Sequence, residues 1–239
     1  MPAGRQTPTR KNPVPRAIAT LKEGPLHAAL KNWYGQAGDQ FEVPIDGRQV
    51  DIVRGDLLIE IQTSSFAAIR KKLESLVENH PVRLVHPVAI EKWIVRIDDE
   101  GHQLSRRKSP KSGRLEDAFE ELVSLPKLLT HTNFSLEILL TQEDEVRKHE
   151  PGRVWHRKGW VVVERRLVCV AETRVIVEPR DLKRLLPTGL PRPFTTAHLA
   201  DRLAISRDLA QKMAYCLRES GAIRADGKHG NAVTYRRST

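Results

Sequence analysis

The sequence predicts an α/β protein in which helices cover one mixed sheet and a small domain follows at the C-terminus. Apolar residues recur at helical spacing in several segments of the first 140 residues. Short runs with strand-like apolar patterns, bounded by turn residues, lie between those segments. The proline-rich stretch PTGLPRP at 187–193 then forbids regular structure and separates a last unit, 194–239.

The first 16 residues contain four prolines, four basic side chains and no acidic one. This composition cannot bury a core, so we expect a disordered basic arm at 1–16. A domain at 17–142 would follow it. Pro25 suits the first turn of a helix with Leu26, Ala29, Leu30 and Trp33 as its buried stripe, ending at Gly35.

The next segments predict an antiparallel meander followed by alternating helices and strands. The predicted strands are 41–45, 48–53, 57–63, 82–88, 93–97 and 134–140, and the predicted helices are 66–77 and 115–123. Residues 98–113 are expected to form a polar, basic loop. Residues 143–193 form a charged connector with short strand candidates at 159–164 and 167–170 and a short helix at 181–186.

The C-terminal unit at 194–239 has the spacing of a helix-turn-helix. Thr195 or Thr196 can cap a first helix, and Ser206 caps a second that runs from Arg207 to Ser220. Two strand-like pieces then flank a basic turn. The unit resembles a winged helix-turn-helix domain, and the side chains expected to contact DNA are Arg207, Gln211, Lys212, Arg218 and Lys228.

Charge and composition limit the classes of partner. The net charge is +10 and the sequence pI is about 9.9, which favours polyanions, with nucleic acid first and an anionic membrane surface as the alternative. The predicted loop adds Arg106, Arg107, Lys108 and Lys111 for phosphate contacts. No apolar run approaches about 20 residues, so we expect a cytoplasmic protein without a membrane span. Two distant cysteines predict reduced thiols.

Three polar residues give the best indication of chemistry. Asp51, Glu60 and Gln62 lie on predicted neighbouring strands, and Glu60 interrupts an apolar run. A buried carboxylate is costly unless it is paired or binds a cation, so Asp51 and Glu60 together would suit a hard divalent metal. The alternative is that these residues have structural roles only. Asp51 could end a hairpin strand, Glu60 could pair with a surface lysine, and Gln62 could lie at a solvated strand end.

The order helix, three-stranded meander, helix, strand places these three residues where the PD-(D/E)XK nuclease superfamily carries its signature. Residues 18–140 therefore resemble the restriction-endonuclease-like core of that superfamily, and the whole resembles uncharacterised bacterial proteins of this architecture. The resemblance implies that Asp51 and Glu60 bind Mg²⁺ or Mn²⁺ and that Glu23 on the first helix assists. Gln62 stands where the family usually has lysine. Lys71 and Lys72 on the following helix could substitute, although we expect both to be solvated surface lysines.

The expected function is a metal-dependent DNA endonuclease that a winged helix positions on duplex or branched DNA. Cutting both strands would need a symmetric homodimer or two sequential nicks. The alternative is a catalytically inactive DNA-binding protein or regulator, which Gln62 favours. A third hypothesis is an interaction protein whose winged helix docks another protein.

Overall fold

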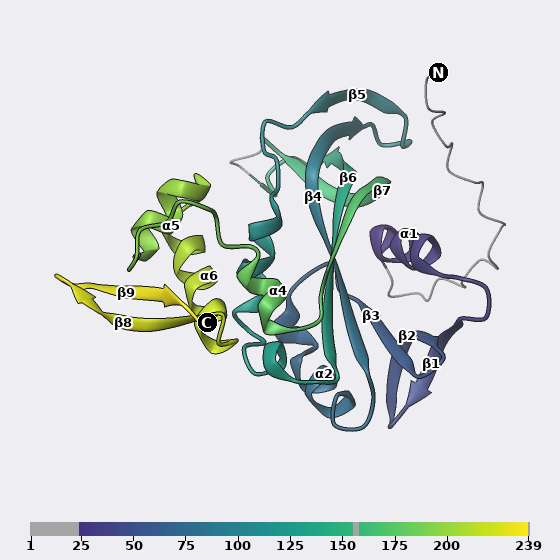
Figure 1. Cartoon of the computed structure of the whole chain (residues 1–239). Helices are drawn as coiled ribbons and strands as arrows, with labels where there is room; N and C mark the ends of the chain where they lie inside the picture. The colour runs from purple at the N-terminus through teal and green to yellow at the C-terminus, as the bar shows by residue number, and fades with distance from the viewer. Residues whose placement is uncertain (1–23, 155–157, 239) are drawn as a thin grey trace, which may run out of the picture.

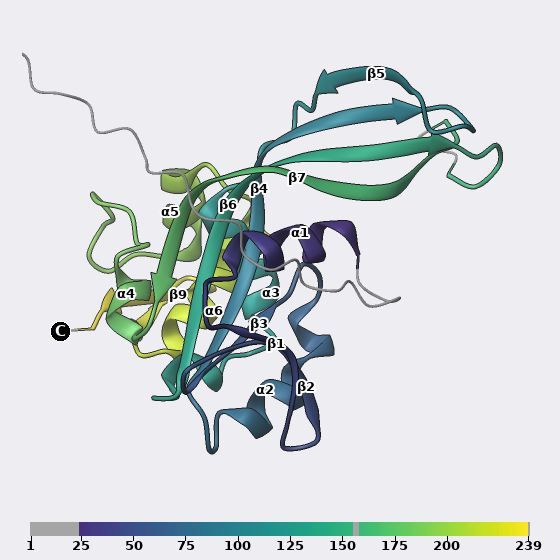
Figure 2. The ribbon, with the colours of Figure 1, turned by 90° about the vertical axis from the view of Figure 1, so that its right-hand side faces the viewer.

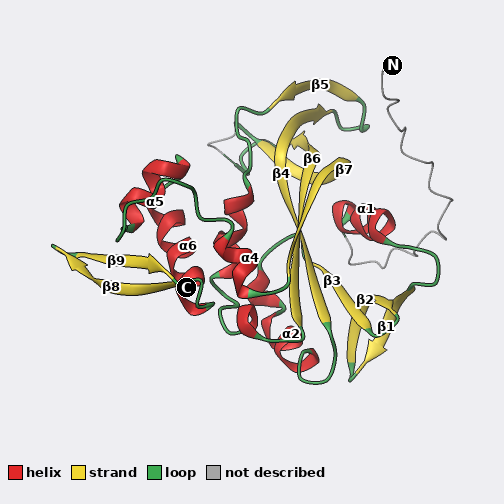
Figure 3. Ribbon diagram, in the orientation of Figure 1, coloured by secondary structure: helices red, strands yellow, loops and turns green. Residues whose placement is uncertain are grey.

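One seven-stranded sheet organises the chain, and helices lie on both of its faces (Figures 1 and 3). The structure is a computed structural model that describes residues 24–154 and 158–238. The strand order is β1-β2-β3-β4-β6-β7, and β5 pairs with β4 outside this path. β4 is parallel to β3 and to β6, whereas the other pairs are antiparallel. The predicted α/β class with a mixed sheet is therefore confirmed.

The predicted first helix and the meander are present. They are α1 (Pro25–Tyr34), β1 (Gln40–Ile45), β2 (Arg48–Arg54) and β3 (Leu57–Ile61). Asp46 and Gly47 both adopt positive φ in the tight turn between β1 and β2. The predicted basic arm at 1–16 and Glu23 lie outside the described residues.

The second half of the sheet has longer strands than the sequence predicts. Its elements are η1 (Phe66–Ala68), α2 (Arg70–Leu76), β4 (Val82–Ile97), β5 (Gln103–Lys108), η2 (Leu115–Ala118), α3 (Phe119–Leu122), η3 (Leu128–Thr130), β6 (Phe134–His149) and β7 (Trp160–Ile176). Predicted strands 82–88 and 93–97 are one strand with a shift of register between Ala89 and Glu91. The expected loop at 98–113 contains β5, whose side chains are all exposed and so carry no apolar pattern.

About half of the predicted connector is part of the sheet. β6 runs through the expected boundary at 142/143, and the strand candidates 159–164 and 167–170 are joined in β7. β7 pairs with β6 from Trp160 to Ile176. It lies at the edge of the sheet, where charged residues are tolerated, and its charged side chains concealed its length in the sequence.

The outer halves of β4, β6 and β7, together with β5, extend beyond the helices. Figure 2 shows these strands as a curved projection, which we call the strand extension (residues 90–97, 103–108, 141–149 and 160–170). Trp93 and Trp160 lie under arginines there, with the Arg106 and Arg96 guanidinium carbons 4.6 and 4.5 Å from the ring centroids. These cation–π contacts help to order a region with a limited core.

Separate apolar clusters lie on the two faces of the sheet. α1 packs Leu26, Leu30 and Tyr34 against Ile59 and Ile61, while Leu58 faces the larger cluster on the opposite side. This alternation of β3 agrees with the sequence prediction. The predicted stripe of α1 was wrong at Trp33, which is 40% exposed.

Lys31 occupies a buried position on α1 in place of that tryptophan. Its side chain is fully buried and pairs with Glu42, which lies on β1 at a positive φ. The pairing provides the counter-charge that a buried ammonium needs.

The C-terminal elements share the larger apolar cluster with the sheet. They are α4 (Pro179–Lys183), α5 (Thr196–Leu203), α6 (Arg207–Glu219), β8 (Ile223–His229) and β9 (Ala232–Arg237). Thr195 and Ser206 cap α5 and α6 through their hydroxyl oxygens, as the sequence predicts. Leu199, Leu209 and Met213 belong to one continuous cluster with Phe66 and Leu122. The C-terminal unit is therefore packed on the sheet domain.

Neither cysteine forms a disulfide: Cys169 is exposed and Cys216 is buried. Burial raises the pKa of the Cys216 thiol to about 12. None of the described helices has the length and apolar character needed to cross a membrane.

Gly113 fixes the loop after β5 onto β4, and its replacement tests that contact. A Cβ on Gly113 would lie 2.5 Å from the main-chain oxygen of Ala89, whereas one on Gly24 would meet nothing within 4 Å. We expect Gly113→Ala to lower the free energy of unfolding by about 1–3 kcal/mol, since the backbone must shift. Gly24→Ala, at the N-cap of α1, should lower it by less than about 1 kcal/mol. Urea denaturation measures both, and equal losses would contradict the packing described.

Candidate active site

Asp51 and Glu60 lie side by side on β2 and β3. The antiparallel register pairs Ile52 with Ile59, which brings the two flanking carboxylates together at the end of the strands. Both are largely buried, with side chains 14% and 5% exposed. The two carboxylates that the sequence predicts to act together are therefore neighbours in the fold.

Asp51 is held by donors from two other elements. Its Oδ2 accepts a hydrogen bond from the Ile61 N–H at 2.8 Å and lies 3.2 Å from His27 Nε2 on α1. Burial alone would raise the pKa of the Asp51 carboxyl. The His27 contact, the Ile61 N–H and the charge of Lys72 outweigh this effect and lower the pKa below its ordinary value. Asp51 therefore stays ionised.

Glu60 has a different environment. Burial and the nearby Asp51 charge raise its pKa to about 7, although Lys72 opposes the shift. Lys72 Nζ lies 2.7 Å from Glu60 Oε1 as an ion pair. Glu60 Oε1 is a buried oxygen without a hydrogen bond among the described residues. The site thus holds one ionised carboxylate and one that titrates near neutrality.

Lys72 occupies the position beside Glu60, which corrects our expectation for this residue. It lies on α2, and its side chain is 22% exposed, whereas its neighbour Lys71 is exposed. The prediction that both are solvated surface lysines was therefore wrong for Lys72. Its sequence position gives no sign of this, because the contact depends on how α2 packs below β3.

Gln62 serves the turn after β3. The side-chain amide nitrogen of Gln62 donates to the Ser65 main-chain oxygen at 2.7 Å. The main-chain oxygen of Gln62 lies 2.7 Å from His86 Nδ1. The His86 ring is 8% exposed, packs edge-on against Phe66, and has a pKa lowered by burial. Gln62 thus anchors the turn, and Lys72 is the residue that meets Glu60.

A charged cavity of about 580 Å³ adjoins this turn. His86, Lys92, Lys111 and Arg165 are among its lining residues. Arg165 also lines a smaller cavity with His27, and its guanidinium lies 3.4 Å from the Thr63 main-chain oxygen. Arg165 therefore lines both the cavity beside His27 and the larger charged cavity.

Arg165 is fixed by a buried acid. Two of its nitrogens donate to Glu143 Oε2 at 3.0 and 2.7 Å, and the Thr141 hydroxyl donates to Glu143 Oε1 at 2.7 Å. Glu143 is 1% exposed. This geometry leaves Lys92 and Lys111 as the more adaptable cations of the cavity, with Lys92 3.7 Å from Glu145.

A second acidic group lies in the turn between β4 and β5. Ligand atoms of Asp98, Glu100 and His102 lie within 4.8 Å of one another, so these residues could hold a metal ion. The group is mostly exposed, and the His102 N–H donates to Asp98 Oδ1 at 2.7 Å, as in an ordinary turn. Its alternating pattern was visible in the sequence but was not predicted as a site.

The residues predicted to contact DNA form two separate groups. Arg106, Arg107 and Lys108 lie on exposed β5, where Arg106 pairs with Asp144 and Lys108 with Glu91. Lys111 lines the charged cavity, and Lys228 is exposed near the turn between β8 and β9.

On α6, Arg207, Gln211 and Arg218 are exposed. Lys212 differs, because it pairs with Glu120 of α3 and with Asp208, so it faces the sheet domain. Arg114 strengthens the same junction by donating to the Leu203 and Ala204 main-chain oxygens. Lys212 is thus engaged in ion pairs at this junction, whereas the other three members of the predicted set on α6 are exposed.

Comparison with known proteins places the chain in a family. Residues 24–177 match the family described as "Domain of unknown function (DUF8091)", and the chain belongs to it. The matched region ends one residue after β7. An uncharacterized protein of Treponema pallidum (strain Nichols) is 29% identical over 223 residues, covering 92% of this chain and 87% of that protein. No solved structure matches the chain.

The titration of Glu60 should make stability depend on pH in a defined direction. The folded-state pKa of Glu60 is about 7, above the ordinary 4.5. Between these two pH values the folded protein keeps a proton on Glu60 that the unfolded chain has lost. Stability should therefore fall as pH rises from about 4.5 to 7. Glu60→Gln should remove this loss and be more stable than wild type above pH 7, on the order of 2 kcal/mol.

Urea denaturation in EDTA from pH 4.5 to 8 measures the difference. Glu78→Gln, at an exposed carboxylate after α2, is the control and should follow the wild-type curve. A pH-independent difference between Glu60→Gln and wild type would show that burial of Glu60 is described wrongly.

Proposed function

We propose that this DUF8091 protein is a metal-dependent endonuclease that hydrolyses phosphodiester bonds in DNA. The observation that carries the proposal is the contact of four side chains from four elements: Asp51 on β2, Glu60 on β3, Lys72 on α2 and His27 on α1. Buried neighbouring carboxylates with a lysine against one of them are expensive to maintain for stability alone. The resemblance to PD-(D/E)XK nucleases gives the arrangement a chemical purpose.

The carboxylate pair suits a divalent cation. The buried Glu60 carboxylate has the Lys72 ammonium as its counter-charge among the described residues, and burial together with the Asp51 charge still raises its pKa. Mg²⁺ or Mn²⁺ held by Asp51 and Glu60 would counter both effects, and water and phosphate oxygens would complete the ligand set. When bound, such an ion would lower the pKa of a water and stabilise charge on the phosphate.

His27 would position the Asp51 carboxylate, and Lys72 would stabilise negative charge in the site. His27 keeps Asp51 ionised and oriented through its contact with Oδ2. Lys72 places a positive charge beside the carboxylates, where it can orient the attacking water or donate to a phosphate oxygen. It thus takes the role that Gln62, a residue without charge, cannot perform.

DNA is the substrate class that the surrounding charges favour. Arg165, Lys92 and Lys111 lead from the carboxylates into the charged cavity and would bind phosphates next to the cleavage site. Arg207, Gln211 and Arg218 on α6 would contact a more distant part of the duplex if the C-terminal unit acts as a winged helix. The expected assembly for double-strand cutting is a homodimer or two sequential nicking events.

A second candidate function is DNA binding without cleavage. The observation that favours it is Gln62, whose amide is occupied by the turn and which replaces the usual lysine. The exposed face of α6 would serve this function equally well.

Plasmid nicking tests the proposed activity. Wild type should nick supercoiled DNA in Mg²⁺ or Mn²⁺ and lose the activity in EDTA. Glu60→Gln and Asp51→Asn should each reduce the rate by at least about 100-fold, because each removes a proposed charged ligand. Lys72→Ala should reduce it by about 100-fold, while Lys71→Ala on the adjacent exposed position should retain wild-type activity.

Equal effects of the two lysine changes would contradict the role assigned to Lys72. DNA binding without any nicking, with or without added metal, would instead support the alternative of an inactive DNA-binding protein.

Salt dependence of binding tests the charged cavity independently of cleavage. In the Glu60→Gln background, Lys111→Ala should weaken duplex binding and reduce the slope of log K against log salt by about 1, as expected for one lost phosphate contact. Lys127→Ala, at an exposed lysine away from the cavity, should leave the slope unchanged. Fluorescence anisotropy between 50 and 200 mM salt measures both. An unchanged slope for Lys111→Ala would remove this cavity from the DNA path.

A further inference from the structure

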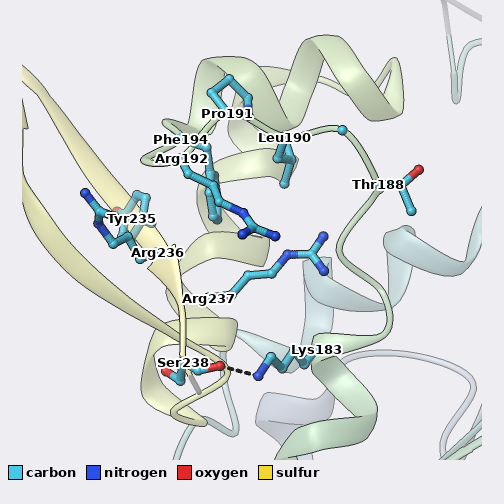
Figure 4. Close-up of a pocket in the computed structure, with 11 residues that line it drawn as sticks. Lys183, Thr188, Leu190, Pro191, Arg192, Phe194, Tyr235, Arg236, Arg237 and Ser238 are labelled. Atoms are coloured by element: carbon cyan, nitrogen blue, oxygen red, sulfur yellow. Dashed lines mark hydrogen bonds between the residues drawn. The ribbon is translucent and has the colours of Figure 1, made fainter.

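A second basic cavity lies at the opposite end of the chain. It has a volume of about 510 Å³ and is bounded by the end of α4, the proline-rich segment 187–193 and β9 (Figure 4). Phe194 and Tyr235 exchange main-chain hydrogen bonds of 3.0 and 2.7 Å, so the proline-rich segment is fixed against β9. The cavity therefore has defined walls, although the sequence predicted only a linker there.

Four cations line this cavity, and none of the described lining residues is acidic. They are Lys183, Arg192, Arg236 and Arg237. Arg236 pairs with Asp226 outside the cavity at 2.7 Å. Lys183 donates to the Ser238 main-chain oxygen and Arg237 to the Pro187 main-chain oxygen, so among the described residues the partners of both are neutral.

Arg192 and Arg237 both line the cavity. Figure 4 shows the Arg192 side chain extending from the proline-rich segment and the Arg237 side chain extending from β9, and the Arg237 guanidinium donates to the Pro187 main-chain oxygen at 2.7 Å. Among the described residues, no hydrogen bond or ion pair holds the Arg192 guanidinium. Neither guanidinium group pairs with an acidic side chain among the described residues, and their planar donors fit a phosphate group.

The remaining lining defines the rest of the ligand. Leu190, Pro191, Phe194 and Tyr235 give the cavity a mainly apolar wall beside the cations. Its volume falls within the range of small-molecule sites, about 300–1,000 Å³. A ligand with a ring system joined to a phosphate group would therefore place the phosphate against the cations and the ring against the apolar wall.

We propose that this cavity binds a phosphate monoester carried on a nucleoside. The phosphate lies between Arg192 and Arg237, and the nucleoside packs on the apolar wall. A free nucleotide and the phosphorylated 5′ end of a DNA strand present the same chemistry. The site is separate from Asp51 and Glu60 and does not require the proposed nuclease activity.

Calorimetry with the full-length protein in EDTA tests the proposal, since no cleavage can occur there. The probes are AMP, adenosine and inorganic phosphate, and a short oligonucleotide with either a 5′-phosphate or a 5′-hydroxyl. We expect at least one of two results. Either AMP binds at least tenfold more tightly than adenosine, or the 5′-phosphorylated oligonucleotide binds at least tenfold more tightly than its 5′-hydroxyl form. Tight binding of AMP alone identifies a free nucleotide, and discrimination between oligonucleotide ends identifies a DNA end.

Arg192→Gln is the main variant because its guanidinium supports no described hydrogen bond, so the fold should be retained. It should weaken binding of the phosphorylated probe at least tenfold. Arg224→Gln, at an exposed arginine on β8 outside the cavity, should leave binding unchanged. The proposal is overturned if no phosphorylated probe binds, if inorganic phosphate binds as tightly as AMP, or if Arg192→Gln binds like wild type.

Discussion

The repulsion between two buried carboxylates, Asp51 and Glu60, is the constraint around which the site is organised. Each carboxylate sits on a different strand, and burial strengthens their interaction because water cannot screen it well. His27 and the Ile61 N–H compensate Asp51, and Lys72 partly compensates Glu60. The Lys72 ammonium does not cancel the effect of burial and of the Asp51 charge, because the pKa of Glu60 stays raised, and a bound cation would add the missing positive charge.

The sheet brings these groups together from both of its faces. α1 packs on one face and supplies His27, while α2 packs on the other and supplies Lys72 (Figure 3). β3 lies where antiparallel pairing with β2 changes to parallel pairing with β4. The end of β3 therefore meets the Gln62 turn and the charged cavity without an intervening strand. Through shared apolar residues and the Lys212–Glu120 pair, the C-terminal unit is held on the same framework.

The sequence predicts elements well where local signals are strong. The proline at the start of α1, the Asp46-Gly47 turn and the hydroxyl caps of α5 and α6 each determine backbone geometry within a few residues. Long strands were harder to predict, because β5 and much of β7 expose their side chains and have no core pattern. Their limits come from pairing with β4 and β6, which is non-local.

The site residues divide in the same way into those predictable from local sequence and those that depend on non-local packing. Asp51 and Glu60 could be paired from strand alternation and hairpin geometry, both of which are local. Lys72 and His27 could not, because their roles depend on how two helices pack on opposite faces. Glu143 beneath Arg165 is likewise a contact between β6 and β7, and both residues were expected to lie in a connector.

Anomalous diffraction from crystals of the wild-type protein soaked in Mn²⁺ tests the central claim most directly. If the carboxylate repulsion exists to bind a cation, the strongest anomalous peak lies between Asp51 and Glu60. Lys72 should then have moved away from Glu60 Oε1. A peak confined to the Asp98, Glu100 and His102 turn, with the Lys72–Glu60 pair intact, would contradict the claim.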